Sequence, residues 1–144
     1  MILADTGAML ALMDRHDRRH EAVSAIYRAN PDGWVLPWAI LPEVDYLVAS
    51  EIGPRAQDVW LSDLASGAFA VEWARDGDLE AAARINRRYK SLRLGLVDAT
   101  VIALAERLKV EAIATLDLRH FGAVRIKGTP RLLPRDAQAG DRER

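Results

Sequence analysis

Four acidic residues occupy positions where folding is expected to bring them together. Asp5 and Asp117 each come directly after a short apolar run that predicts a β-strand. The carboxyl ends of parallel strands form a common crevice, so both carboxylates are expected to point into it. Glu43 and Asp98 stand within apolar stripes at helical spacing and are expected to share a face with core residues. The spacing therefore predicts an all-carboxylate cluster.

Such a cluster needs a positive charge among its members. Two unit charges about 4 Å apart repel by on the order of 4 kcal/mol at an effective dielectric of about 20. No lysine or arginine is adjacent in sequence to Asp5, Glu43 or Asp98. A hard divalent cation that keeps water ligands, Mg²⁺ or Mn²⁺, meets this need. A bound ion of this kind activates water toward a phosphodiester, so the implied reaction is hydrolysis of RNA or DNA.

Each acid also has a structural alternative. These are helix capping at Asp5, a salt bridge at Glu43, a helix-dipole partner at Asp98 and the start of a turn at Asp117. Capping is less favoured at Asp5 because Thr6 is available as the cap. Asp45 follows Glu43 by two residues, about 200° around a helix, so it points away and is predicted to be structural.

The apolar periods that position these acids predict an α/β domain with a mainly parallel sheet, because strands and helices alternate along the chain. Strands are predicted over residues 1–4, 34–36, 69–71 and 112–115, with one edge strand between 118 and 133. Helices are predicted over residues 7–13, 21–29, 40–51, 54–66, 76–89 and 94–108, with a short helical turn after 117.

Length and composition restrict the classes of protein that remain. The 144 residues, half of them hydrophobic, fit one domain over 1–134, followed by a tail over 135–144 that is predicted to be disordered. The absence of cysteine excludes disulfides and thiolate metal sites and favours a reducing cytoplasm. The apolar start of the chain contains Asp5 and is too short to span a bilayer, so no membrane association is expected. A net charge of -1 favours no partner.

Four ordered segments resemble the signature segments of the PIN-domain family, most of all its VapC-type toxins from bacterial type II toxin-antitoxin pairs. They are MILADT at 1–6, PEVDYLV at 42–48, GLVDA at 95–99 and TLDLRHF at 115–121. In that resemblance Asp5, Glu43 and Asp98 match the three core acids and Asp117 the fourth, more variable one. Thr6 and Thr115 fall at positions that support the cluster by hydrogen bonding.

The resemblance implies a three-layer α/β/α sandwich and a magnesium- or manganese-dependent endoribonuclease that acts on transfer or ribosomal RNA. It also implies a cytoplasmic homodimer that is inhibited by a small antitoxin protein. Two alternatives stay open: a housekeeping RNA-processing nuclease without an antitoxin, and a catalytically silent domain that only binds RNA or a partner.

Two basic clusters flank the acidic segments and are candidates for phosphate binding. The first spans residues 15–20. The second contains Arg84, Arg87, Arg88, Lys90 and Arg93. Arg119 and His120 follow Asp117 closely and are expected to touch substrate. The four tryptophans, Trp34, Trp38, Trp60 and Trp73, are expected to belong mainly to the core, with some lining a groove for an antitoxin segment.

Overall fold

The computed structural model describes residues 1–139 and contains one five-stranded sheet in which every pairing is parallel. The strand order is β3-β2-β1-β4-β5. The strands are β1 Ile2–Ala4, β2 Trp34–Pro37, β3 Ala70–Glu72, β4 Ala112–Ala114 and β5 Arg131–Leu133. The two central strands, β1 and β4, are buried over their whole length. Their unbroken apolar runs are typical of strands covered on both faces.

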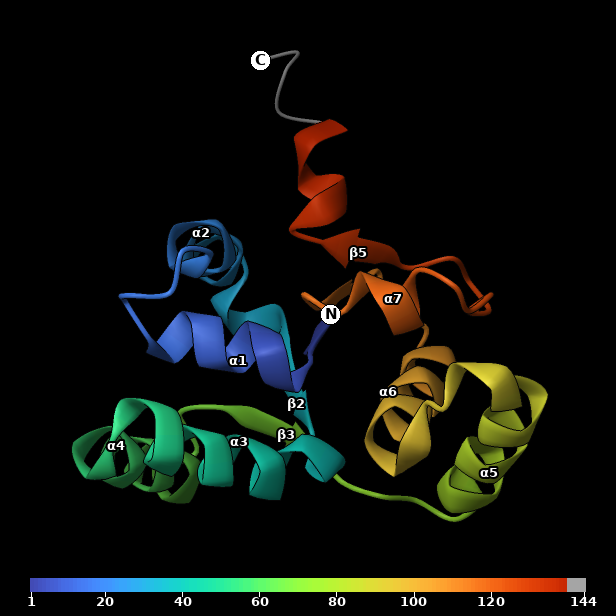
Figure 1. Ribbon diagram of the computed structural model, residues 1–144, viewed down its shortest axis with the longest axis horizontal. Helices are drawn as coiled ribbons and strands as arrows, with labels where there is room; N and C mark the ends of the chain where they lie inside the picture. Colours follow the sequence, from blue (N-terminus) through green and yellow to red (C-terminus); the bar gives the residue numbers. More distant parts are fainter. Residues whose placement is uncertain (140–144) are drawn as a thin grey trace.

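Helices cover both faces of the sheet and complete an α/β/α sandwich. Figure 1 shows α1 and α2 on one side of the central strands, with α5 and α6 on the other. The helices are α1 Thr6–Met13, α2 His20–Ala29, α3 Leu41–Leu47, α4 Pro54–Ser66, α5 Asp78–Arg88, α6 Gly95–Leu108 and α7 Leu118–Phe121. The predicted fold class is confirmed. No helix in the described part of the chain is long and apolar enough to cross a membrane.

Two predicted segments differ from the structure. The single helix predicted over 40–51 is a 3₁₀ turn at Trp38–Ile40, then α3, then a π-helical segment at Val48–Ile52 that ends at Gly53. The first residues of the predicted tail form a 3₁₀ helix at Arg135–Ala139. Asp136 ties that helix to the sheet edge by accepting the Leu132 N–H at 2.7 Å. The rest of the predicted tail lies outside the described residues.

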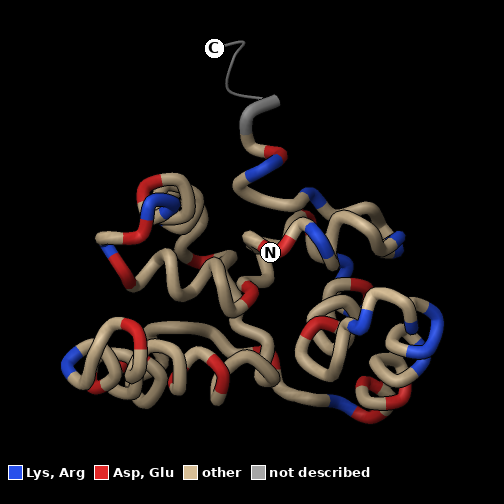
Figure 2. Tube along the Cα trace, in the orientation of Figure 1, with Lys and Arg blue, Asp and Glu red and all other residues tan. Residues whose placement is uncertain are grey.

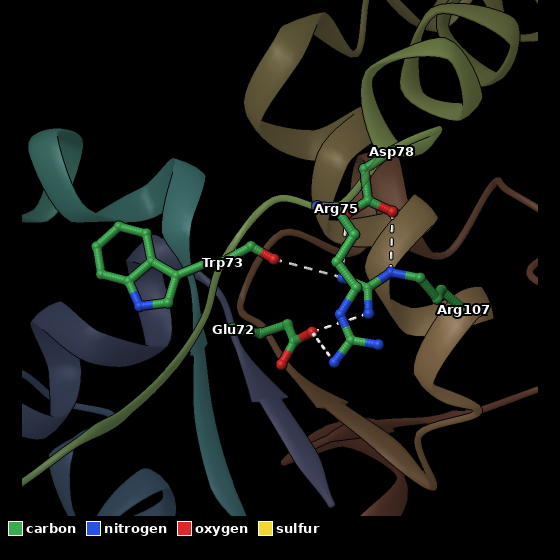
Figure 3. Close-up of polar contacts among 5 residues, drawn as sticks. All are labelled: Glu72, Trp73, Arg75, Asp78 and Arg107. Atoms are coloured by element: carbon green, nitrogen blue, oxygen red, sulfur yellow. Dashed lines mark hydrogen bonds and ion pairs between the residues drawn. The ribbon is translucent and has the colours of Figure 1, made fainter.

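An arginine cluster, formed by Arg107 with Glu72 and Asp78, joins the end of β3 to α5 and α6 (Figure 3). Arg107 donates from Nε to Asp78 Oδ1 at 2.8 Å, from Nη2 to Asp78 Oδ2 at 3.0 Å and from Nη1 to Glu72 Oε1 at 2.8 Å. The Asp78 side chain is only 5% exposed. Burial raises the Asp78 pKa, but the hydrogen bonds from Arg107 and from the Arg75 N–H outweigh it and leave that pKa below its usual value.

Candidate metal centre

Asp5 follows the carboxyl end of β1, next to the point where the strand order of the sheet reverses. β1 is the central strand: the chain runs from it through β2 to β3 at one edge and then returns to β4 on the other side of β1. The strand order therefore reverses between β1 and β4, which is where α/β sheets form their ligand crevice. The Asp5 N–H donates to the Ala114 carbonyl of β4 at 2.9 Å. The Asp5 carboxylate also caps α1, because Oδ1 accepts the Thr6 N–H at 2.8 Å. Asp5, and not Thr6 as the sequence suggested, is therefore the residue that caps α1, and this contact uses only one of its two carboxylate oxygens.

Thr115 couples Asp5 to the chain that leaves β4. Its hydroxyl donates to Asp5 Oδ2 at 3.1 Å and accepts the Asp117 N–H at 3.0 Å. Thr115 is 1% exposed, so both contacts are protected from water. The two acids that follow central strands are thus both hydrogen-bonded to one buried hydroxyl.

The short helix α7 carries Asp117 and His120 toward the crevice. Asp117 caps it, because Oδ1 accepts the His120 N–H at 3.1 Å. The turn that ends α7 requires Gly122, because a Cβ there would collide with the Leu118 carbonyl oxygen. Asp117 therefore does begin a turn, which was the structural alternative for this residue. Its Oδ2 nevertheless faces the centre, 3.0 Å from His120 Nδ1.

His120 occupies the space between two carboxylates. Its Nδ1 lies 2.5 Å from Asp98 Oδ2 as well as 3.0 Å from Asp117 Oδ2. Two acceptors around one ring nitrogen require that Nδ1 carry the proton. The sequence predicts that His120 touches substrate, but it does not predict that His120 lies among the acids. The signal was its position three residues after Asp117 on a helical turn, which places both on one face.

Asp98 and Glu43 approach from helices. Asp98 stands in the first turn of α6 with a side chain 16% exposed. Burial raises its pKa, and the charges of Asp117 and Glu43 add to that effect, which together outweigh the lowering by His120. Glu43 is exposed, contrary to the expectation that it would share a face with core residues. The buried stripe runs through Val44 and Val48, and Glu43 flanks it while remaining close enough to Asp98 for its charge to act.

Asp5 bears the strongest sign of uncompensated charge. It is 5% exposed, and burial raises its pKa to about 7. The N–H of Thr6 and the hydroxyl of Thr115 lower that pKa, while the charges of Asp98 and Asp117 raise it. Among residues 1–139, no lysine or arginine forms an ion pair with any of the four acids.

The donor set fits a divalent cation. One ligand atom each from Asp98, Asp117 and His120 lies within 4.8 Å of the others, and Asp5 is joined to this group through Thr115. The Thr6 hydroxyl is buried beside Asp5 and has no hydrogen-bond partner, so it is free to orient a water bound to the ion. Carboxylate oxygens with few neutralising partners are the ligands that Mg²⁺ and Mn²⁺ prefer.

The other predicted contacts divide between the surface and the core. Arg87, Arg88, Arg93 and Arg119 are all exposed, as substrate-binding residues would be.

Trp34 and Trp60 are buried, and Trp38 is partly buried. Trp73 is 64% exposed and is the one tryptophan of the four that is open to a partner. Asp45 accepts two hydrogen bonds from the Gln57 amide at 3.2 Å, so its predicted structural role is confirmed.

The sequence of this chain matches a family model and a protein of known name. The family model described as PIN domain matches residues 2–127. Ribonuclease VapC26 of Mycobacterium tuberculosis is 38% identical over 124 residues, which cover 86% of this chain and 92% of that protein.

Solved structures share the fold at lower identity. VapC20 of Mycobacterium tuberculosis, described as a toxin that cleaves the sarcin-ricin loop, superposes with a TM-score of 0.77 at 22% identity, over 89% of this chain and 98% of its own. VapBC of Salmonella typhimurium, solved bound to DNA, gives a TM-score of 0.69 at 17% identity over 91% and 95% of the two chains. FitAcB of Neisseria gonorrhoeae also gives 0.69, at 18% identity over 92% and 96%.

Proposed function

The chain belongs to the PIN-domain family, and on that premise we propose that it is a ribonuclease and the toxin component of a type II toxin-antitoxin pair. The proposed reaction is the hydrolysis of internal RNA phosphodiesters, in transfer or ribosomal RNA. The relative at 38% identity is a ribonuclease, and the match covers nearly all of both chains. The proposed location is the cytoplasm.

The observation that carries this proposal is the shortage of positive charge at the end of β1 and β4. Asp5 and Asp98 both have raised pKa values, and no arginine or lysine neutralises them in the described chain. The carboxylates of such a site repel one another, and a bound cation relieves this repulsion. We assign Asp5, Glu43, Asp98 and Asp117 as the residues that hold it and that carry catalysis.

A bound Mg²⁺ or Mn²⁺ would supply a water of lowered pKa and charge neutralisation at the departing oxygen. The chain's own residues set the geometry. Thr115 holds the Asp5 carboxylate and the Asp117 backbone N–H, and the Thr6 hydroxyl, which has no hydrogen-bond partner, is available to orient water. His120 Nδ1 holds a proton between Asp98 and Asp117, and in this proposal His120 touches the substrate.

The proposed partners are an RNA substrate, a small antitoxin protein and a second copy of this chain. Support for the antitoxin comes from the solved VapBC and FitAcB structures, which share the fold of this chain. Several large apolar side chains are open to such partners in the described chain. They include Tyr46, Val59, Trp73, Leu79 and Leu96.

The test is incubation of purified protein with total RNA, with Mg²⁺, with Mn²⁺ and with a chelator, followed by mapping of the new RNA ends. We expect cleavage only when metal is present, and a rate on the order of a thousandfold lower for Asp98→Asn. Asp45→Asn is the matched control, because Asp45 contacts Gln57 instead of the centre. Cleavage that persists in Asp98→Asn, or that ignores the chelator, would contradict the proposal.

Growth of cells that express the protein separates the toxin from the two alternatives. A toxin arrests growth, and Asp98→Asn relieves the arrest. A housekeeping nuclease cleaves RNA without arresting growth. A silent domain binds RNA and leaves it intact. Light scattering of the purified chain measures whether it is a homodimer.

A further inference from the structure

A pocket of about 280 Å³ lies between α5, α6 and the segment that follows α7, outside the carboxylate cluster. Its floor is apolar and comes from all three elements: Ile85 of α5, Ile102 of α6 and Val124. Four basic residues form its rim, and we call them the cationic rim. They are Arg84, Arg88, Arg125 and Lys127.

The cationic rim carries more positive charge than its surroundings neutralise. All four side chains belong to exposed residues, and within residues 1–139 none of them forms an ion pair. Glu106 is the one acid that lines the pocket, and its Oε1 accepts the Lys127 N–H at 3.3 Å. Figure 2 shows basic positions gathered at the end of α5 and along the segment between α7 and β5. The pocket is therefore suited to an anion.

Tyr89 fixes the pocket wall. Its hydroxyl accepts the Arg125 N–H at 3.1 Å, which ties the segment after α7 to the end of α5. The Arg88 guanidinium lies over the Tyr89 ring, 5.6 Å from its centroid. An aromatic ring beside apolar side chains is a surface for a nucleotide's base or sugar, and a guanidinium such as that of Arg88 is matched to phosphate oxygens.

Two segments of the chain that contribute residues to the carboxylate cluster also line the pocket. Ile102 is four residues after Asp98 on α6, about 6 Å of helical rise. Val124 is likewise four residues after His120. The pocket lining therefore begins about one helical turn from the carboxylate cluster along α6.

We propose that the cationic rim binds a phosphate of the RNA strand next to the one that is cleaved, while the floor and Tyr89 receive the attached nucleoside. This inference rests on the proposed ribonuclease function and adds a binding site to it. An acidic peptide would use the charge but not the apolar floor with its aromatic wall, so RNA is the occupant that uses both.

The experiment measures binding of a fluorescein-labelled single-stranded 12-nucleotide RNA by anisotropy, in chelator to prevent cleavage, at several salt concentrations. The variant is Arg84→Gln with Arg125→Gln. We expect affinity to fall on the order of tenfold and the slope of log affinity against log salt to fall by about 0.7, the value for one lost phosphate of a single strand. In cleavage assays KM should rise while kcat changes little.

The matched control is Arg28→Gln with Arg55→Gln, which removes the same charge from α2 and α4. Arg28 forms only an exposed pair with Glu21 at 3.9 Å, and Arg55 is exposed. Lys127→Glu serves as a second test variant because it reverses a charge on an exposed residue without removing a side chain from the core. Thermal unfolding of every variant shows whether it is folded.

Equal affinity and equal salt slope in the test and control variants would overturn the pocket proposal. So would displacement of the RNA by inorganic phosphate or by an acidic peptide at the same concentration as unlabelled RNA. Failure of the ribonuclease proposal has a different signature, because the unaltered protein would then show no metal-dependent cleavage at all.

Discussion

The carboxylate cluster and the arginine cluster hold acids of the same type in opposite electrostatic states. Asp78 is as little exposed as Asp5, but three hydrogen bonds to its carboxylate come from Arg107 and the Arg75 backbone, and its pKa is lowered. Asp5 receives hydrogen bonds only from uncharged donors, and its pKa is raised to about 7. Both side chains are shielded from solvent, but Asp5 lies deeper in the protein, so its deeper burial and its lack of a counter-charge together set its pKa apart from that of Asp78.

The contrast separates acids that hold the fold from acids that await a ligand. A carboxylate paired with arginine stabilises the folded chain and has little to gain from a metal ion. A carboxylate that is buried among other carboxylates destabilises the folded chain until a cation arrives, which is a common property of functional sites. The pKa direction therefore indicates which acidic group is the candidate centre.

The largest effect on stability is expected from Arg107→Met. It leaves the Asp78 carboxylate buried without its partner, and breaking such a pair costs about 3–5 kcal/mol of unfolding free energy. Because the folded pKa of Asp78 is lowered, the stability it contributes is present above the unfolded value of 3.8 and is lost as pH falls through the folded pKa. The cost of Arg107→Met should therefore shrink in acid. Urea unfolding at pH 7 and pH 3 measures both values.

Arg75→Met is the control for that change. The Arg75 guanidinium lies 3.5 Å from Glu72 but its side chain is 66% exposed, and exposed pairs contribute less than about 1 kcal/mol. If Arg107→Met cost no more than Arg75→Met, the arginine cluster would not be a stabilising element and the contrast would fail.

Asp5→Asn is expected to act in the opposite direction. Because the folded pKa of Asp5 is about 7, above the unfolded value of 3.8, its favourable contribution is complete below pH 3.8 and is lost as pH rises through 7. Asparagine imitates the protonated acid and can still cap α1. In chelator, the variant should match the unaltered protein near pH 4 and exceed its stability by roughly 2–4 kcal/mol at pH 8.

Asp45→Asn provides the comparison at each pH, because Asp45 lies outside the centre and is bonded to Gln57. A stability difference that grows equally in both variants would show that the effect belongs to surface charge in general. The same Asp5→Asn protein should be inactive on RNA, so a gain in stability would accompany a loss of function.

How far the sequence could predict these two clusters depends on the distance between partners. Asp5 and Asp117 follow strands, and the rule that parallel strands share one functional edge was enough to place both. Arg107 meets Asp78 and Glu72 across 29 and 35 residues. No local spacing marks such a contact, because it arises only when α5 and α6 pack together. The arginine cluster was therefore missed.

Helical periodicity predicted the position of Glu43 less well. The spacing of Ile40 and Leu47 predicts that Glu43 shares the core side, whereas the fully buried positions are Ile40, Val44 and Val48, and Glu43 lies at the margin of the stripe that they form. A heptad spacing drifts around a helix over two turns, so a residue at its margin is easily assigned to the wrong face. The roles of the four acids remain predictions that only the variants can test.

Thr115→Val is expected to have the smallest effect on stability. It tests directly whether Thr115 holds the carboxylate cluster in place. Valine keeps the shape but removes the hydroxyl that donates to Asp5 and accepts from the Asp117 N–H. Lost hydrogen bonds of this kind cost about 1 kcal/mol each, so unfolding free energy should fall by roughly 1–2 kcal/mol at pH 8. RNA cleavage should fall more than that cost suggests, because Asp5 and Asp117 lose their common anchor. Thr115→Ser, which keeps the hydroxyl, should restore most of the cleavage rate. If serine and valine behaved alike, Thr115 would matter for packing alone.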